Sequence, residues 1–275
     1  MPEKHAIQPG QSIELLKELH ILTRDGKLNQ DSRRKLKQVN HLYQFIEPLL
    51  KEVQRDHDGI TLVDHGAGKS YLGFILYDLF FKCLDGNSHI FGIETRDELV
   101  EKSRELAGRL QFPGMSFLNL SVAESIYSDT LPATVDVVTA LHACNTATDD
   151  AILFALKKSA RFIVLVPCCQ AEVAAVLRKN KAASLAANSL AEIWRHPIHT
   201  REFGSLITNV LRCLQLEAHG YQVNVTELVG WEHSMKNELI IATYKDLPRR
   251  RPAERLHQTL DSLGLAEMSN RFFTS

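Results

Sequence analysis

Two amphipathic helices are predicted at the start of the chain from the spacing of their apolar residues. Apolar side chains recur every three or four positions over 11–23 and again over 31–55, which is the period of a helix with one buried face. Asp31 is expected to cap the second helix, and Pro48 is expected to kink or split it. Residues 1–58 are therefore interpreted as a helical N-terminal extension.

From residue 60 the pattern changes to short apolar runs that alternate with helical segments. The runs have the length of buried strands and lie at 60–64, 89–94, 115–120, 135–141 and 161–166. Helices are predicted at about 69–83, 97–110, 149–158, 171–194 and 204–219. Strands that alternate with helices are typical of βαβ units, in which a parallel sheet is covered on both faces.

Two last apolar runs are predicted to form an antiparallel pair. The link between 220–229 and 238–244 is too short for a parallel crossover. The fold class is therefore α/β, with a seven-stranded, mostly parallel sheet and an antiparallel last strand, which is the Rossmann-like plan of class I methyltransferases. Residues 59–245 form that domain in this interpretation, and 246–275 form a C-terminal tail with one short helix.

The composition excludes several classes of protein. Of the 275 residues, 44% are hydrophobic and 24% are charged, so disordered and fibrous classes are excluded. The 32 basic and 33 acidic residues give a formal charge of -1, so contact with nucleic acid requires a local basic patch. No stretch of about 18 apolar residues occurs, and the segment MPEKHAIQPGQS lacks the apolar core of a signal peptide, so no membrane is expected. Five cysteines without CxxC spacing favour a reducing, cytoplasmic setting.

A glycine loop follows the first predicted strand, in the segment VDHGAGKSYLG. The strand ends at Asp64, and the chain turns through Gly66 and Gly68 into a helix. Glycines at this spacing let the backbone approach a ligand, and the helix start offers free N–H groups. A tight strand-to-helix turn can also need glycine for packing alone, so the loop becomes informative only together with its neighbours.

Two further carboxylates follow the next two strands. Glu94 ends the second strand, where a carboxylate suits a hydrogen bond to ribose hydroxyls. The alternative is a charge at the start of the helix over 97–110. Glu124 follows the third strand and is expected to accept from the amine of adenine, although Ser121 or Ser125 could do so instead. The three loops together predict a nucleoside site.

The spacing of the loop selects among nucleosides. A triphosphate loop needs glycine where Val63 stands, and a dinucleotide loop needs its third glycine where Tyr71 stands. S-adenosylmethionine carries no phosphate, and its cationic amino group favours a carboxylate such as Asp64. Its sulfonium methyl is already activated, so the protein supplies mainly positioning and electrostatics. S-adenosylmethionine is therefore the predicted cofactor.

Four further segments carry a family resemblance. They read LHACNTATDD at 141–150, VPCCQ at 166–170, HPIHTREFGSLITNVLR at 196–212 and HSMKN at 233–237. With DHGAGKSYL, they resemble a class I methyltransferase family that includes bacterial proteins of unassigned substrate and the glutathione S-transferase C-terminal-domain-containing protein. The HAC and CC motifs are also similar to those of a tRNA 2′-O-methyltransferase. The resemblance spans about 33–245 and implies the class I fold and S-adenosylmethionine.

The candidate catalytic residues are His142, Asn145 and Lys236. His142 follows the fourth strand, where it would also contact the cofactor and could act as general base, or could simply bond the backbone of a turn. Relatives often have aspartate where Asn145 stands, so any acid or base role is lost at this position. The asparagine could hold a substrate amide or hydroxyl, or could cap the following helix. Lys236 would neutralise an anionic acceptor, or stay solvated in a hairpin.

The substrate side of the predicted site includes Cys168, Cys169, Gln170 and Asn237. A zinc site would need His142 and Cys144 as partners of the two cysteines, and that spacing is not a known one, so no metal is predicted. A nucleophilic cysteine would need a lowered pKa. Small wall residues beside the cofactor are the favoured interpretation.

Two basic clusters raise the question of the acceptor. The first consists of Arg33, Arg34, Lys35 and Lys37, and the second of Arg195, His196, His199 and Arg201. Either could meet phosphates or form a solvated helix face. We predict an S-adenosylmethionine-dependent methyltransferase whose extension is a lid or a substrate platform and whose preferred acceptor is RNA. A protein or small-molecule acceptor is the first alternative, and a cofactor-binding protein without catalysis is the second.

Overall fold

A computed structural model describes residues 7–84, 87–141, 146–167, 171–180, 192–193, 195–228, 238–246 and 251–273. One seven-stranded sheet forms the centre, in the order β3-β2-β1-β4-β5-β7-β6. The strands are β1 (Thr61–His65), β2 (His89–Glu94), β3 (Met115–Asn119), β4 (Val137–Leu141), β5 (Phe162–Val166), β6 (Tyr221–Glu227) and β7 (Glu238–Tyr244). β1 to β5 are parallel, and β7 is antiparallel to both β5 and β6. The predicted Rossmann-like sheet is confirmed.

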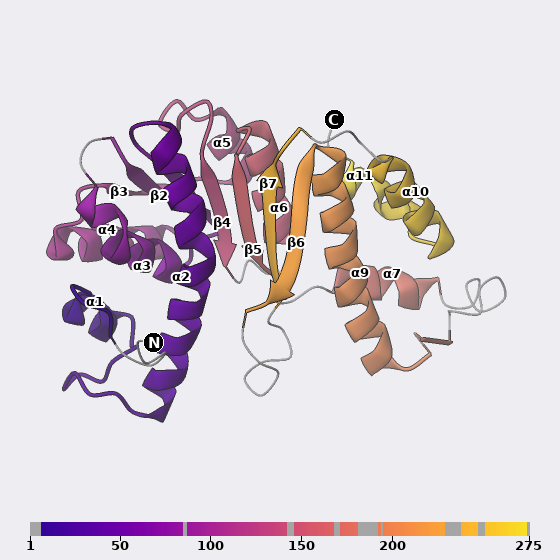
Figure 1. Cartoon of the computed structure of the whole chain (residues 1–275). Coiled ribbons are helices and arrows are strands. Elements are labelled where there is room, and N and C mark those ends of the chain that lie inside the picture. Colours follow the sequence, from indigo (N-terminus) through magenta and orange to yellow (C-terminus); the bar gives the residue numbers. More distant parts are fainter. Residues whose placement is uncertain are drawn as a thin grey trace.

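Helices cover both faces of this sheet (Figure 1). The helices of the described residues are α1 (Ile13–Glu18), α2 (Gln30–Asp56), α3 (Tyr71–Leu79), α4 (Asp97–Leu110), α5 (Val122–Tyr127), α6 (Thr146–Lys157), α7 (Glu172–Lys179), α9 (Pro197–Ala218), α10 (Pro252–Ser262) and α11 (Ser269–Phe272), with 3-10 turns at Phe81–Cys83 and Ala266–Met268. One apolar core lies between one face of the sheet and the helices α1, α2, α3 and α4. A second core lies between the other face and α5, α6 and α9. Alternate residues of β1 to β5 and of β7 supply the two cores, as expected of a doubly covered sheet.

The N-terminal helices pack into the first core. Leu16 of α1 and Ile46 and Leu50 of α2 are fully buried in it. Pro48 lies inside α2, and the helix continues through it over 27 residues, so the expected split does not occur. Because buried residues on both sides of Pro48 pack against the domain, tertiary contacts outweigh the local cost of the proline.

Helix α2 begins earlier than expected, so the predicted cap at Asp31 is wrong. Asn29 has an extended backbone, and its side-chain oxygen accepts from the N–H of Ser32 at 2.8 Å. Asparagine is as good an N-cap as aspartate, and the sequence offers both within three residues. The short helix α5 is a further element that the pattern did not predict, since six residues are too few to show a period.

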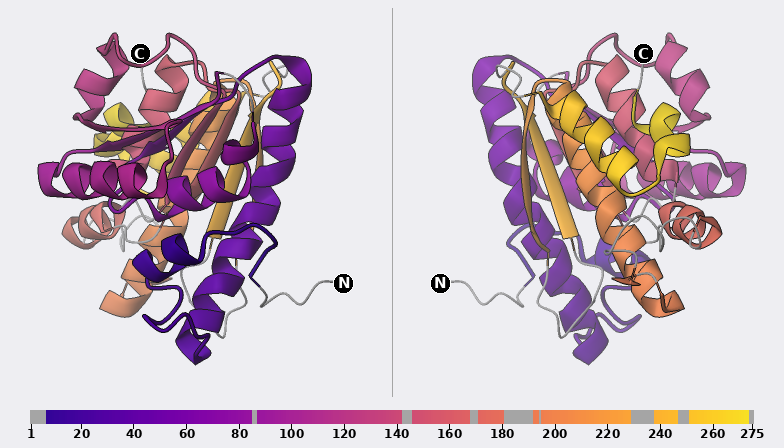
Figure 2. Two further views of the ribbon diagram at one scale, coloured as in Figure 1. Left: turned by 90° about the vertical axis from the view of Figure 1, so that its left-hand side faces the viewer. Right: turned by 90° about the vertical axis from the view of Figure 1, so that its right-hand side faces the viewer.

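The C-terminal residues pack against the domain instead of extending from it. Leu256, Leu260 and Phe272 are buried in a third apolar cluster with residues of α7 and α9. Figure 2 shows α10 and α11 against α9. Among the described residues, no helix has both the length and the apolar character that a membrane crossing requires.

Candidate cofactor site

The glycine loop connects β1 to α3 at the carboxyl edge of the sheet. Gly66 has φ of +66° and Gly68 of +57°, in the left-handed region that favours glycine. The N–H of Ala67 donates to the carbonyl of Ile93 in β2 at 2.9 Å, which fixes the turn beside the neighbouring strand. The backbone conformation at these two positions therefore favours glycine, as the motif predicts.

Asp64 lies buried beneath the loop and is held on both oxygens. Its Oδ1 accepts from the hydroxyl of Thr139 at 2.8 Å, and its Oδ2 accepts from the hydroxyl of Ser70 at 3.2 Å. The N–H of Gly73 also donates to this carboxylate. Burial raises the pKa of Asp64 to about 6, although these three donors oppose the shift. The carboxylate is thus poised to gain from a nearby cation.

Ser70 is a residue of the site that sequence reasoning missed. It is fully buried and has φ of +48°, so the chain takes positive φ at alternate positions through Gly66, Gly68 and Ser70. A Cβ on Gly73 would lie 2.5 Å from the Ser70 hydroxyl, so glycine is needed there to make room. The serine therefore carries a left-handed conformation that costs about 1 kcal/mol relative to glycine.

Thr139 is the second missed residue. It lies in β4 directly beside Asp64 of β1, because the two are Cα partners in the parallel register. The one available signal was a hydroxyl residue inside the apolar run VDVVTAL, which a buried strand accepts only when the hydroxyl is bonded.

Glu94 reaches the glycine loop from the end of β2. Its Oε2 accepts from the N–H of Gly68 at 2.8 Å, and its Oε1 accepts from the backbone N–H of Arg96 at 3.1 Å and the guanidinium Nε at 3.0 Å. Burial raises the pKa of Glu94, but the bonds from Arg96 and Gly68 outweigh burial and leave the pKa below its usual value. An ionised carboxylate therefore stands beside the loop. Because Arg96 is the N-cap residue of α4, Glu94 also contacts the start of that helix.

Glu124 is engaged in its own helix. Its carboxylate accepts from the N–H of Ser121 at 2.7 Å and from the Ser121 hydroxyl at 2.6 Å, which forms a capping box at the start of α5. The side chain is exposed, and its hydrogen bonds hold the pKa below the usual value. A bond to adenine stays a prediction.

His65, the last residue of β1, points away from Asp64 and was also missed. Its side chain is buried, and its ring lies 5.3 Å from the ring of Phe154. Neither ring nitrogen has a hydrogen-bond partner among the described residues. Burial lowers the pKa of His65 to about 4, although the charge of Glu94 opposes this, so the imidazole is neutral at pH 7.

The other predicted site residues lie outside the described residues. These are His142, Asn145, Cys168, Cys169, Gln170, Lys236 and Asn237. In the sequence they fall in three connections, which follow β4, follow β5 and precede β7. Their roles stay predictions.

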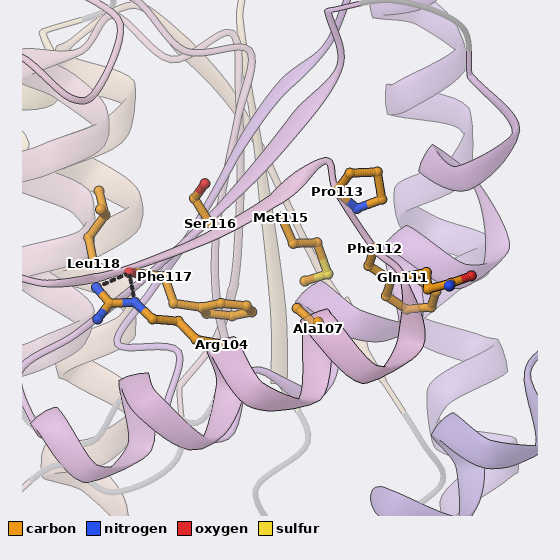
Figure 3. A pocket seen from close by; sticks show the side chains of 10 residues that line it. Arg104, Ala107, Gln111, Phe112, Pro113, Met115, Ser116, Phe117 and Leu118 are labelled. Carbon is orange, nitrogen blue, oxygen red and sulfur yellow. Dashed lines mark hydrogen bonds between the residues drawn. The ribbon is translucent and has the colours of Figure 1, made fainter.

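A cavity of about 700 Å³ lies elsewhere, between α4 and the edge strand β3 (Figure 3). Arg104 spans it and donates to the carbonyl of Phe117 from Nε at 3.0 Å and from Nη2 at 2.7 Å. None of the predicted site residues that the structure describes lines this cavity. A second cavity of about 550 Å³ adjoins the loop at Lys69 and Tyr71.

The sequence matches a family described as a methyltransferase domain over residues 34–176. That match covers 143 of the 275 residues. The chain belongs to this methyltransferase family. Membership confirms the predicted enzyme class and S-adenosylmethionine as cofactor. The described residues fit this cofactor, because two carboxylates at a glycine loop suit a cationic nucleoside without phosphate.

Curated relatives extend the similarity beyond that match. Glutathione S-transferase C-terminal domain-containing proteins of Xenopus laevis and Bos taurus are both 22% identical to this chain, over 237 and 239 residues. The alignments cover 80% of this chain but 36% and 35% of those proteins. The chain thus spans about a third of the length of the curated relatives it matches.

Solved structures of methyltransferases have a similar fold. Magnesium protoporphyrin IX methyltransferase from Synechocystis with bound SAH is 16% identical, with a TM-score of 0.45 over 86% of this chain and 96% of that chain. A putative caffeoyl-CoA O-methyltransferase from Staphylococcus aureus is 10% identical, with a TM-score of 0.47 over 85% and 92%. Similarity of this degree says nothing about the substrate of this chain.

Proposed function

We propose that this chain transfers the methyl group of S-adenosylmethionine to RNA. The observation that carries the proposal is the position of the two basic clusters relative to the sheet. The first lies in the first turns of α2, and the second lies just before α9 and in its first turns. Both helices begin at the end of the molecule towards which the parallel strands run (Figures 1 and 2).

Contacts at the opposite ends of these helices support that orientation. Arg161, just before β5, donates to Glu52 and Asp56 in the last turns of α2, which therefore ends at the amino edge of the sheet. Helix α9 ends at Ala218, shortly before β6 begins at Tyr221. Tyr221 pairs with Tyr244 of β7, whose N–H donates to the carbonyl of Arg161. The end of α9 therefore also lies at the amino edge of the sheet. Helices of 27 and 22 residues are about 40 and 33 Å long, so their starts project past the carboxyl edge.

The side chains of the two clusters have different surroundings. Arg33 and Arg34 are exposed, whereas Arg195 and Arg201 pair with Glu192 and Glu202 at 3.1 and 2.9 Å. Exposed pairs of this kind are worth little, so phosphates can displace the acidic partners. Basic side chains on both sides of the carboxyl edge of the sheet suit a polyanion wider than a single nucleotide.

The chain's own residues divide the work of transfer. Asp64 and the glycine loop would hold the amino-acid end of the cofactor, Glu94 the ribose and Glu124 the adenine. The bound cofactor supplies an activated methyl group. His142 would take the proton of the attacking hydroxyl, as the similarity to a tRNA 2′-O-methyltransferase implies, while Lys236 would neutralise a neighbouring phosphate. Asn145 and the cysteine segment would line the acceptor side.

The contacts of the N-terminal extension favour a role as a substrate platform over a role as a lid. Asp78 of α3 accepts from the N–H of Ser12 at 2.8 Å, and Lys82 donates to the carbonyl of Gly10 at 2.6 Å. These bonds fix the segment before α1, and α2 shares the main core. We therefore propose that α2 presents its basic end to the acceptor without moving away.

Labelled cofactor offered to separate RNA, protein and metabolite fractions tests the proposal. We expect label in RNA, and we expect His142→Ala and Lys236→Ala to lower kcat or raise KM with unchanged cofactor affinity. Arg33→Glu with Arg34→Glu should weaken RNA binding, whereas Arg55→Glu, at the other end of α2, should not. Label in protein or metabolites would overturn the RNA acceptor, and cofactor binding without any transfer would overturn catalysis.

A further inference from the structure

A buried ionic network centred on Asp149 connects distant parts of the chain. Asp149 stands in the first turn of α6, and Arg212 of α9 donates to it from Nε to Oδ1 at 2.8 Å and from Nη2 to Oδ2 at 2.7 Å. The Arg212 side chain is fully buried. This is a two-pronged contact, which fixes orientation as well as distance.

A second arginine reaches Asp149 from the C-terminal segment. Arg271 of α11 donates to Asp149 Oδ2 at 2.6 Å, and its other terminal nitrogen lies 2.7 Å from Glu172 Oε2. Glu172 is the first residue of α7. One side chain near the C-terminus therefore links the first turns of α6 and α7.

The network also extends to the start of β7. Arg212 donates to Asn209 Oδ1 at 3.2 Å, and the Asn209 amide donates to Glu238 Oε2 at 2.6 Å. Glu238 is the first residue of β7. The network therefore joins the starts of α6, α7 and β7. Each of these elements directly follows one of the three connections that contain the predicted acceptor-side residues.

Other contacts already attach the C-terminal segment to the domain. The third apolar cluster packs α10 and α11 on α9, and Arg255 pairs with Glu217 on the surface. A buried ion network is often no more stabilising than an apolar cluster of the same size, but it fixes geometry tightly. The position of this network therefore indicates a role in alignment beyond attachment.

We propose that Arg271 is a positioning residue for methyl transfer, because it holds the starts of α6 and α7 in register through Asp149 and Glu172. Only the expected effect on turnover rests on the proposed function, whereas the expected effect on amide exchange does not. The carboxylates proposed to bind the cofactor, Asp64, Glu94 and Glu124, lie in β1, β2 and α5, outside the network, so we expect their contribution to cofactor affinity not to depend on Arg271. Misalignment of the acceptor side should lower turnover alone.

Amide hydrogen exchange on the full chain provides a direct measurement. In Arg271→Ala we expect the first hydrogen-bonded amides of α6 and α7, whose acceptors are the carbonyls at the helix starts, to exchange faster by about tenfold or more, with β1 and β2 unchanged. Arg271→Lys should restore part of the protection by keeping one charged donor. Arg255→Ala, which removes the surface pair of the same segment, is the matched control and should leave these amides protected.

Turnover and cofactor binding complete the design. We expect Arg271→Ala to lower kcat on RNA by about 10- to 100-fold, with cofactor Kd within twofold of wild type. Unchanged exchange in Arg271→Ala would overturn the inference, as would faster exchange throughout the domain in both Arg271→Ala and Arg271→Lys. If wild type does not methylate RNA, the proposed acceptor fails, while exchange of the first hydrogen-bonded amides of α6 and α7 still decides the role of Arg271.

Discussion

Ser70 donates its hydroxyl to the buried carboxylate of Asp64 from a left-handed backbone conformation, across 3.2 Å. Ser70→Ala would keep the backbone strain and lose the bond, so we expect a loss of about 1.5–3 kcal/mol in the free energy of unfolding. Ser70→Gly would lose the same bond but relieve strain, so it should be more stable than the alanine variant by about 1 kcal/mol. Urea unfolding measures both.

Ser159 provides the control for backbone strain. It has φ of +49° and is exposed, so glycine there should relieve strain without breaking a buried bond. We expect Ser159→Gly to be more stable than wild type by about 0.5–1 kcal/mol. Equal stabilities of Ser70→Ala and Ser70→Gly would mean that the loop does not store strain at Ser70.

Asp64 should make cofactor affinity depend on pH. Burial raises its pKa to about 6, and a cationic amino group favours the ionised carboxylate. Below pH 6 the carboxyl must lose a proton when the cofactor binds, so Kd should rise by up to about tenfold per pH unit. Calorimetry between pH 7 and 5 should show this trend, and Asp64→Asn should bind weakly with a flat profile. A pH-dependent wild type and an equally pH-dependent Asp64→Asn would exclude this carboxyl as the cause.

His65 should make stability fall in acid. Burial lowers its pKa in the folded chain to about 4, whereas an unfolded histidine has a pKa of about 6.5. The folded state therefore binds fewer protons, so the contribution is present above pH 6.5 and is lost as pH falls towards 4, by up to about 3 kcal/mol. The raised pKa of Asp64 acts in the opposite direction between about pH 6 and 4, so variants are needed to separate the two residues.

The variant His65→Phe keeps an aromatic ring beside Phe154 and removes the titration. We expect it to unfold at higher denaturant concentration than wild type at pH 5, with a smaller difference at pH 7. His199→Phe, at an exposed position, should follow the wild-type profile at both values. Parallel profiles for His65→Phe and wild type would show that the imidazole does not titrate on unfolding.

The sheet could be predicted because buried parallel strands appear in the sequence as short apolar runs. Asp64 and Glu94 could be proposed as site residues because they end the strands that flank the glycine loop. It could not predict Thr139 as the partner of Asp64, since that contact depends on the register between β1 and β4. It also missed the bond from Arg271 to Asp149, which joins residues 122 positions apart. Local patterns report the period of one element, whereas such contacts depend on how elements pack.

Variants of Glu94 can distinguish its predicted role in cofactor binding from a role at the start of α4. Its Oε2 accepts from Gly68 in the loop, and its Oε1 accepts from Arg96 at the start of α4. If ribose is its partner, Glu94→Gln should weaken cofactor binding by about 1–3 kcal/mol, because a charge-assisted hydrogen bond is replaced by a neutral one. Glu98→Gln is the matched control, since Glu98 is an exposed acid in the first turn of α4.

Both variants remove one negative charge near the start of the helix, which should cost each a few tenths of a kcal/mol of stability through the helix dipole. Glu94→Gln should lose more stability than this, because the new amide cannot accept from both Gly68 and Arg96. Affinity should fall only in Glu94→Gln. Calorimetry and thermal unfolding on the same samples distinguish the cases. A lower Tm in both variants with unchanged affinity in both would reduce Glu94 to a helix-end charge, and the ribose would then need another partner at the carboxyl end of β2.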